Sequence, residues 1–386
     1  MKYNYSITTV KQQGLLASVC LLTLFLFLGS CDPEEPMEPG GDEPPPSPTL
    51  GLGIGEARDI SSFDLVAEMG VGWNLGNSFD VTSRDKTLWG NPLPSLSLIN
   101  AVKAMGFTTL RIPITWGFNM RETSPFTVES GYLSQVKAVV DYAFQNQMHV
   151  IINVHHDNDW VVPSAEEAEH AKERLASLWT QVANHFIEYN DSLIFESLNE
   201  PRIEGIPEEW SGGTPEGRGF INDFHKAAVD AIRATGGNNS LRHIMITTWA
   251  ASTVEAAMDD LVIPNDDPKT IISLHTYFPW PFAGEGAIPW GSEQDKQDLI
   301  NEFERIREKW IVEEQRPVIL GEWGTVESNP IDSRLEYARF YASEAAKRDF
   351  LTVVWDDGGM FGLYNRHNSN WDFSNLASAI VTSSNQ

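Results

Sequence analysis

The sequence predicts an α/β fold, a (β/α)8 TIM barrel, from three observations. Short apolar runs recur along the chain about 40 residues apart. Segments with the apolar spacing of a helix lie between them. Most runs end in polar, titratable or aromatic side chains, as expected where the carboxyl ends of barrel strands meet. An open doubly wound sheet is the alternative, but the chain has no glycine-rich phosphate loop to support a nucleotide-binding version.

Eight apolar or β-branched runs are the expected barrel strands. Their nearly continuous apolar character is typical of parallel strands that are buried on both faces. Eight strand–helix units over about 330 residues fit a barrel with loop insertions. The runs cover residues 71–74, 109–114, 150–155, 193–200, 244–249, 271–275, 318–322 and 351–355.

Two of the segments between the runs show clear helix signals. The first has one apolar stripe at i, i+3, i+7 and i+11: Leu133, Val136, Val140 and Phe144. The second covers residues 220–235 and is followed by Gly236 and Gly237, a pair typical of a helix end.

The first 54 residues are not expected to belong to the barrel. Residues 1–30 resemble a secretory signal, because basic residues precede an apolar run that is short for a membrane span. The run ends in Leu-Gly-Ser-Cys31, which resembles a bacterial lipobox, so we expect cleavage before Cys31 and its lipidation. An ordinary signal with an incidental cysteine is the alternative. Residues 31–54 are acidic and proline-rich and predict an extended tether, and residues 55–386 a single domain.

This leader predicts a secreted lipoprotein of the outer membrane, attached to the membrane through the lipid on Cys31. The acidic stretch after Cys31 resembles surface-export signals of some Gram-negative bacteria, so we expect the protein to face outward. The net charge of −27 repels phosphate backbones, and a nucleic-acid partner is therefore not expected. Nothing in the sequence demands more than a monomer.

Two glutamates carry the functional prediction. Glu200 ends the fourth run and Glu322 ends the seventh. Two carboxyl groups in one cleft can cleave a glycosidic bond, since one protonates the leaving oxygen and the other attacks the anomeric carbon. Either glutamate alone could be an ordinary ion-paired residue. Their placement with Arg111, His155 and His275 at one barrel edge favours catalysis.

At these residues the chain resembles glycoside hydrolase family 5, and most closely its subfamily 4 endoglucanases and xyloglucanases. The matching motifs occur in the family's order and cover nearly everything after residue 65. One small departure is Trp323, where family members usually have Phe, and it is expected to narrow the cleft beside Glu322. The motifs are GWNLGN (72–77), RIPITW (111–116), INVHHDN (152–158), FESLNEPR (195–202), HTY (275–277), GEWG (321–324) and WDDG (355–358).

The resemblance implies a role for each catalytic candidate. Glu200 would be the acid/base and Glu322 the nucleophile of a retaining double displacement, with the carboxyl groups about 5–5.5 Å apart. Arg111 would lower the pKa of Glu322 and keep it ionised. The other expected roles are a hydrogen bond from Asn199 to the sugar 2-hydroxyl, a hydrogen bond from Tyr277 to Glu322, contact of His275 with Glu200, and His155 on the subsite floor.

Further residues are expected to bind substrate. Asn74 stands at the first strand end, and Trp355 would be a platform under a sugar ring. His156 is either a substrate contact or a packed histidine. Trp160 and Trp280 lie in predicted loops, as do Trp210 and Trp290, and each could be a sugar platform or a packing residue.

The two adjacent histidines also suggest a metal site. Neighbouring residues of a strand point to opposite faces, so His155 and His156 are poorly placed to bind one ion. No metal and no cofactor are therefore expected. The sequence predicts a retaining endo-β-1,4-glucanase acting on xyloglucan, mixed-linkage glucan or amorphous cellulose. A mannanase or xylanase on the same scaffold, and a non-catalytic surface glycan-binding lipoprotein, are the alternatives.

Overall fold

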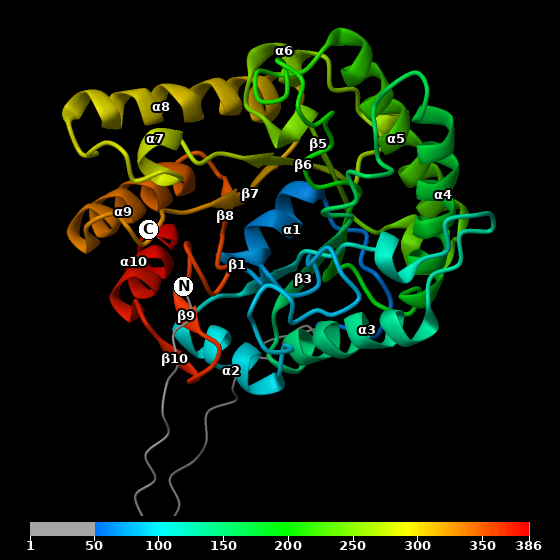
Figure 1. The fold of residues 1–386 in the computed structure, drawn as a ribbon, viewed down its shortest axis with the longest axis horizontal. Coiled ribbons are helices and arrows are strands. Elements are labelled where there is room, and N and C mark those ends of the chain that lie inside the picture. The colour runs from blue at the N-terminus through cyan, green and yellow to red at the C-terminus, as the bar shows by residue number, and fades with distance from the viewer. Residues whose placement is uncertain (1–50, 386) are drawn as a thin grey trace, which may run out of the picture. The chain divides into compact units, whose positions relative to one another are not determined.

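The computed structural model describes residues 51–385, and these residues form a closed eight-stranded barrel (Figure 1). All eight strands are parallel and pair in chain order, and the first strand pairs with the last. The predicted barrel is thereby confirmed, and the open sheet is excluded. The strands are β1 (Gly72–Asn74), β2 (Thr109–Ile112), β3 (His149–Asn153), β4 (Leu193–Glu196), β5 (Ile244–Thr247), β6 (Thr270–His275), β7 (Val318–Trp323) and β8 (Leu351–Val354).

Helices surround the barrel, and a short hairpin of β9 (Tyr364–Asn365) and β10 (Asn370–Trp371) follows the last strand (Figure 1). Both predicted helices are present, although the second begins five residues earlier than expected, where Thr214 caps its first turn. The helices are α1 (Ser62–Met69), α2 (Leu96–Met105), α3 (Ser130–Gln145), α4 (Ala168–His185), α5 (Pro215–Ala234), α6 (Glu255–Asp259), α7 (Trp280–Ala283), α8 (Glu293–Arg307), α9 (Ile331–Ala346) and α10 (Ser374–Ser384).

An apolar plug closes the amino-terminal end of the barrel. Helix α1 contributes Leu65 and Met69 to a buried apolar cluster with side chains from the barrel strands, among them Ile151 and Ile194. Alternate strand residues such as Leu193 and Phe195 belong instead to the larger core between strands and helices. The barrel interior is therefore a packed core at this end.

Several strands end earlier than the sequence predicted. The fourth run was expected to extend to residue 200, but β4 ends at Glu196. The third was expected to extend to residue 155, but β3 ends at Asn153, so His155 and His156 follow the strand. The polar residues beyond each strand end are thus in loops, where successive side chains need not point to opposite faces.

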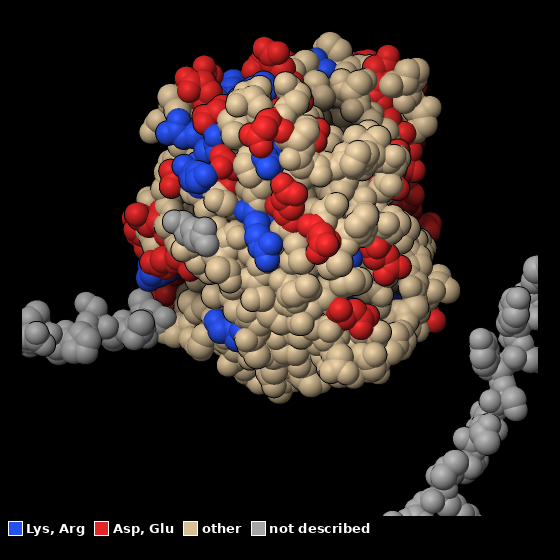
Figure 2. All heavy atoms as spheres, turned by 90° about the vertical axis from the view of Figure 1, so that its left-hand side faces the viewer, with Lys and Arg blue, Asp and Glu red and all other residues tan. Residues whose placement is uncertain are grey.

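The packed body includes residues from Gly53, whose backbone N–H donates to Ser192 Oγ at 3.0 Å. The predicted signal, Cys31 and most of the predicted tether lie outside the described residues. Among residues 51–385, no helix combines the length and apolarity needed to cross a membrane. Figure 2 shows one face of the molecule, on which Lys and Arg side chains lie beside Asp and Glu side chains rather than in a separate basic patch.

Candidate active site

The two predicted catalytic glutamates meet at the carboxyl-terminal mouth of the barrel. An oxygen of Glu200, an oxygen of Glu322 and a nitrogen of His275 all lie within 4.8 Å of one another. His275 Nδ1 donates to Glu200 Oε1 at 2.8 Å. The Tyr277 hydroxyl donates to Glu322 Oε2 at 3.2 Å. The structure thus brings together four residues from three segments that are far apart in the sequence.

A β-bulge turns Glu322 toward the mouth. On β7, Leu320 pairs with Leu274, but the next pair is His275 with Glu322, so Gly321 is an extra residue. A Cβ at Gly321 would lie 3.0 Å from Ser273 Oγ and 3.1 Å from His275 Nε2, which explains why glycine suits this position. Regular alternation would have directed Glu322 outward, and the bulge reverses this.

The same bulge sends Trp323 to the outside of the barrel. Its ring stacks on Tyr341 of α9, with centroids 4.2 Å apart and planes 3° apart, and the side chain is buried. The expectation that Trp323 narrows the cleft is therefore wrong. Trp323 packs between the sheet and α9.

Arg111 lies at the centre of the buried polar network. Its Nη1 donates to Glu322 Oε1 at 2.8 Å, and its Nη2 donates to Asn199 Oδ1 at 2.7 Å. Arg111 occupies the Asn199 carbonyl oxygen, and the Asn199 amide N–H₂ makes no hydrogen bond within residues 51–385. That amide is available to donate to a ligand.

Asn74 is part of this network rather than of the substrate surface. The side chain is fully buried, its Oδ1 accepts from Arg111 Nη1 at 2.9 Å, and its Nδ2 donates to the Gly321 carbonyl at 2.8 Å. The prediction that Asn74 binds substrate is wrong, because its polar atoms are already bonded inside the barrel. Asn74 instead links Arg111 to the bulge of β7.

Glu196 is a functional candidate that the sequence interpretation missed. It is fully buried, and its Oε2 accepts from Arg111 Nε at 2.7 Å. Strand alternation could have identified it. Glu196 lies two residues after inward-facing Ile194, so its side chain also points into the barrel, where a buried charge needs a counter-ion.

The tautomer of His155 follows from its neighbours. Asn153 Oδ1 accepts the backbone N–H of Ile114 at 2.9 Å, so its Nδ2 faces His155 Nδ1, at 3.0 Å. Nδ1 must therefore accept, and the ring carries its proton on Nε2. That nitrogen lies 3.9 Å from Glu322 Oε1, and burial lowers the pKa of His155 well below its usual range. His155 is thus a neutral donor at the mouth.

The pKa directions differ from the expected ones. Burial raises the pKa of Glu322, and Glu200 raises it further, although His275 and Arg111 oppose this. Burial alone would raise the pKa of Glu200, but the hydrogen bond and charge of His275, with the charge of Arg202, lower it. Burial alone would lower the pKa of His275, but Glu322 and Glu200 raise it. These directions favour a proton on His275 over a proton on Glu200.

Exposed aromatic rings lie beside Glu200 and beside His156. A cavity of about 770 Å³ beside Glu200 is lined by Trp210 and Trp280, whose side chains are 61% and 52% exposed. On the side of His156, Trp89 is 39% exposed, and its ring centroid is 5.8 Å from that of His156. The sequence interpretation missed Trp89, which stands in a loop without a strand-end signal. Partly exposed Trp355 lies parallel to His155 at 5.8 Å.

Two of the predicted platforms are packing residues. Trp160 is buried, its Nε1 donates to Asp157 Oδ1 at 2.9 Å, and the Arg174 guanidinium covers its ring at 4.3 Å. Trp290 is also buried, and it packs edge-to-face on Tyr337 at 5.0 Å. The prediction that Trp160 binds sugar is therefore wrong. Of the two roles expected for Trp290, the structure supports packing.

His155 and His156 do not point to opposite faces of a strand, so that expectation is wrong. His155 and His156 follow the strand, their ring centroids are 4.3 Å apart, and with Asp80 they form a cluster with potential ligand atoms within 4.8 Å. However, the carboxylate oxygens of Asp80 accept the backbone N–H groups of Asn77 and Ser78. His155 Nε2, the ring nitrogen that is not bonded to Asn153, carries a proton. It therefore has no lone pair to offer to a metal ion.

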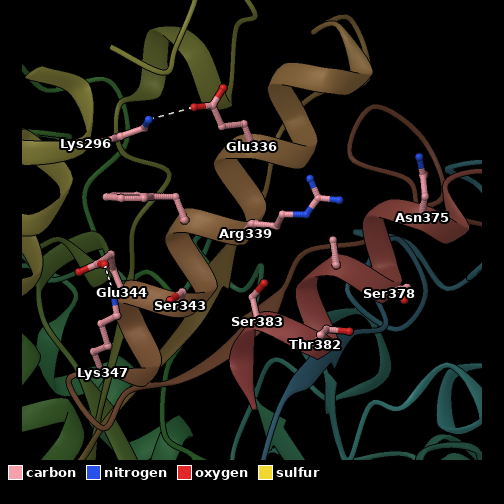
Figure 3. Close-up of a pocket in the computed structure, with 12 residues that line it drawn as sticks. Lys296, Glu336, Arg339, Ser343, Glu344, Lys347, Asn375, Ser378, Thr382 and Ser383 are labelled. Atoms are coloured by element: carbon pink, nitrogen blue, oxygen red, sulfur yellow. Dashed lines mark hydrogen bonds and ion pairs between the residues drawn. The ribbon is translucent and has the colours of Figure 1, made fainter. Parts of the chain in front are cut away.

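A second hollow, of about 740 Å³, lies on the outside of α8, α9 and α10 (Figure 3). Its charged side chains include Arg339 and Lys296, and Lys296 pairs with Glu336 at 3.1 Å. It shares no residue with the cavity beside Glu200. The carboxyl pair, rather than cavity size, therefore identifies the active site.

Known proteins share both the sequence and the fold. The family profile Cellulase (glycosyl hydrolase family 5) matches residues 70–360. Endoglucanase B of Clostridium cellulovorans is 43% identical over 337 residues, which cover 84% of this chain and 76% of that protein.

Two solved structures are similar throughout the barrel. The structure of ZgEngAGH5_4 in complex with a cellotriose has a TM-score of 0.84 and 46% identity, and the match covers 85% of this chain and 100% of that one. A GH5-4 broad specificity endoglucanase from Clostridium acetobutylicum has a TM-score of 0.81 and 43% identity, covering 83% and 99%.

Proposed function

We propose a retaining double displacement for this chain, which belongs to glycosyl hydrolase family 5 and is an endo-β-1,4-glucanase. The observation that carries the mechanism is the close approach of Glu200 and Glu322, whose nearest oxygens lie within 4.8 Å. Retaining enzymes hold their carboxyl groups about 5–5.5 Å apart, whereas inverting enzymes leave about 6.5–9.5 Å for a water molecule.

In the first step, Glu322 attacks the anomeric carbon and forms a glycosyl ester while Glu200 gives a proton to the leaving oxygen. In the second step, Glu200 takes a proton from water, and this water displaces Glu322. Arg111 and Tyr277 both donate to Glu322 and fix its oxygens for attack. The free amide of Asn199 is suited to the sugar 2-hydroxyl, a contact that strengthens as the transition state forms.

The proton for the leaving oxygen is held by Glu200 and His275 together. His275 Nδ1 lies 2.8 Å from Glu200 Oε1, so a proton can move along one hydrogen bond between them. A sugar chain that covers the cleft removes water from Glu200, and desolvation favours its neutral form. Substrate binding would thus move the proton from His275 to Glu200, where the acid step needs it.

The substrate that fits is a neutral, accessible β-glucan. Exposed aromatic faces beside Glu200 and beside His156 suit a chain of several sugar rings, which internal cleavage requires the cleft to hold. Similar solved structures include a xyloglucan-specific endo-beta-1,4-glucanase and a lichenase, each 32% identical. We therefore propose xyloglucan, mixed-linkage glucan or amorphous cellulose as substrates. A mannanase or xylanase has no observation in its favour, and a non-catalytic binding protein would not need the paired carboxylates.

We further propose that the enzyme is anchored to the outer membrane, facing outward, through a lipid on Cys31. The support is the sequence alone, namely the apolar run, the lipobox-like tetrad and the acidic stretch that follows. Radiolabelled fatty acid should be incorporated into the full chain and lost on Cys31→Ser. Equal labelling of the variant would contradict the anchor.

The experiment that tests the reaction follows the anomer formed during early hydrolysis of a cello-oligosaccharide by NMR. The β-anomer should appear first and then mutarotate, and initial release of the α-anomer would contradict double displacement. Reducing-end assays on xyloglucan, mixed-linkage glucan, carboxymethylcellulose, mannan and xylan would rank the substrates. Glu322→Ala should abolish turnover, and Glu313→Ala, at an exposed glutamate without an ion pair among the described residues, is the matched control.

A further inference from the structure

One buried cation serves two carboxylates in this barrel. The Arg111 guanidinium bonds Glu196 through Nε at 2.7 Å and Glu322 through Nη1 at 2.8 Å. The side chains of Arg111 and Glu196 are fully buried, whereas that of Glu322 is 8% exposed at the cleft. Glu196 therefore cannot touch a substrate, but it acts on the same cation as the proposed nucleophile.

Glu196 is held in place by groups from two further strands. Its Oε2 also accepts from Asn153 Nδ2 of β3 at 3.1 Å, and its Oε1 accepts from Ser273 Oγ of β6 at 2.6 Å. Asn153 in turn contacts His155 Nδ1. These donors hold both Glu196 oxygens in place inside the barrel, where screening by water is weak.

Because Arg111 pairs with two carboxylates, it stabilises the anion of each less than it would stabilise a single partner. Arg111 and Glu196 together carry no net charge, so Glu322 lies beside a nearly neutral pair rather than an isolated positive charge. Burial raises the pKa of Glu322 even though Arg111 is in direct contact with it. The other groups that face Glu322 are His155 after β3, Glu200 after β4, and His275 and Tyr277 at the end of β6.

We propose that Glu196 is a positioning residue that holds Arg111 and offsets part of its charge, so that Glu322 remains basic enough to attack the anomeric carbon. A carboxylate paired with an unshared arginine would be more stable as an anion and a weaker nucleophile, because nucleophilic and basic strength change together. The proposal rests on the role of Glu322 proposed above. It assigns a function to a charge that no substrate contacts.

The test is the pH dependence of kcat/KM for Glu196→Gln, which removes the charge but keeps the shape. The positive charge of Arg111 would then stabilise the Glu322 anion without competition from Glu196. The acid limb of the pH profile should therefore move to lower pH by about one unit. The plateau value of kcat should fall severalfold. Ser273→Ala is the matched control, because it removes a hydrogen bond to Glu196 without changing any charge, and its acid limb should stay in place. Glu196→Asp keeps the charge and should bring the limb back toward the wild-type position.

An acid limb that stays in place in folded Glu196→Gln, or that moves equally in Ser273→Ala, would overturn the proposal. If Glu196→Gln does not fold, the proposal is tested by carboxyl-carbon NMR of the wild-type protein, which follows the titration of Glu322. Glu322 should titrate above the ordinary glutamate range, and titration below it would show that Arg111 acts unshared. Glu322→Ala is measured in parallel: if it keeps turnover, the nucleophile assignment fails, and if only the Glu196 results fail, that assignment stands.

Discussion

The two ends of the barrel are built from the same strands and have opposite chemistry. On β4, Ile194 belongs to the apolar plug under α1, and two residues later Glu196 belongs to the ionic network around Arg111. The plug is made stable by burial of apolar area, whereas the network contains charges whose desolvation costs free energy. Groups that stabilise the fold and groups that serve catalysis are therefore separated along the strand axis, here by two residues.

The largest expected effect is at the polar end. Glu322→Ala removes the proposed nucleophile, and kcat should fall by about 10⁴-fold or more. The free energy of unfolding should change little, because Arg111 keeps Glu196 as its partner. Reducing-end kinetics and urea unfolding measure the two quantities. A variant that unfolds readily would show that the network also stabilises the fold, and the separation would then be incomplete.

The plug should show the converse behaviour. Ile194→Ala leaves a cavity in a fully buried position, so the free energy of unfolding should fall by about 2–5 kcal/mol. The activity per folded molecule should stay near that of the wild type. Ile288→Ala, at a position that is 43% exposed, is the matched control and should cost less than about 0.5 kcal/mol. Loss of kcat in folded Ile194→Ala would mean that the two ends are coupled.

Within the mouth, exposed and buried tryptophans should also differ. Trp280→Ala removes an exposed ring beside Glu200 and should raise KM about tenfold, which corresponds to about 1.4 kcal/mol of binding. Trp160→Phe changes a buried ring that bonds Asp157 and should lower stability without a comparable change in KM. Initial-rate kinetics on one soluble glucan and thermal unfolding separate the two effects. Equal KM values for Trp280→Ala and the wild type would remove Trp280 from the substrate surface.

The smallest expected effect is a displacement of the pH profile. Activity requires Glu322 ionised, and since burial raises its pKa, the acid limb should lie above the ordinary glutamate range. Activity also requires a proton on the pair of Glu200 and His275. Because Glu322 and Glu200 raise the pKa of His275, the alkaline limb should lie above the ordinary histidine range. The pH dependence of kcat/KM measures both limbs, and a flat profile through the acidic range would contradict this assignment.

Much of the fold could be predicted, because a barrel strand needs only a local pattern. Apolar runs of the right length and spacing are sufficient to predict eight buried parallel strands. The residues at their ends identified the mouth and the Glu200–Glu322 pair. The inward or outward direction of single side chains could not be predicted from strand alternation, since one inserted residue at Gly321 reverses it for both Glu322 and Trp323.

The sequence by itself determined the barrel, its chain order and the residues that gather at its carboxyl end, because these depend on local pattern. Only the tertiary structure decided which polar groups bond to one another. Asn74 is turned inward, Trp160 is covered by Arg174, and Arg111 is shared between Glu196 and Glu322. Each of these outcomes depends on distances of a few ångströms between strands, since hydrogen bonds and buried charges act only at that range, and no local pattern records them.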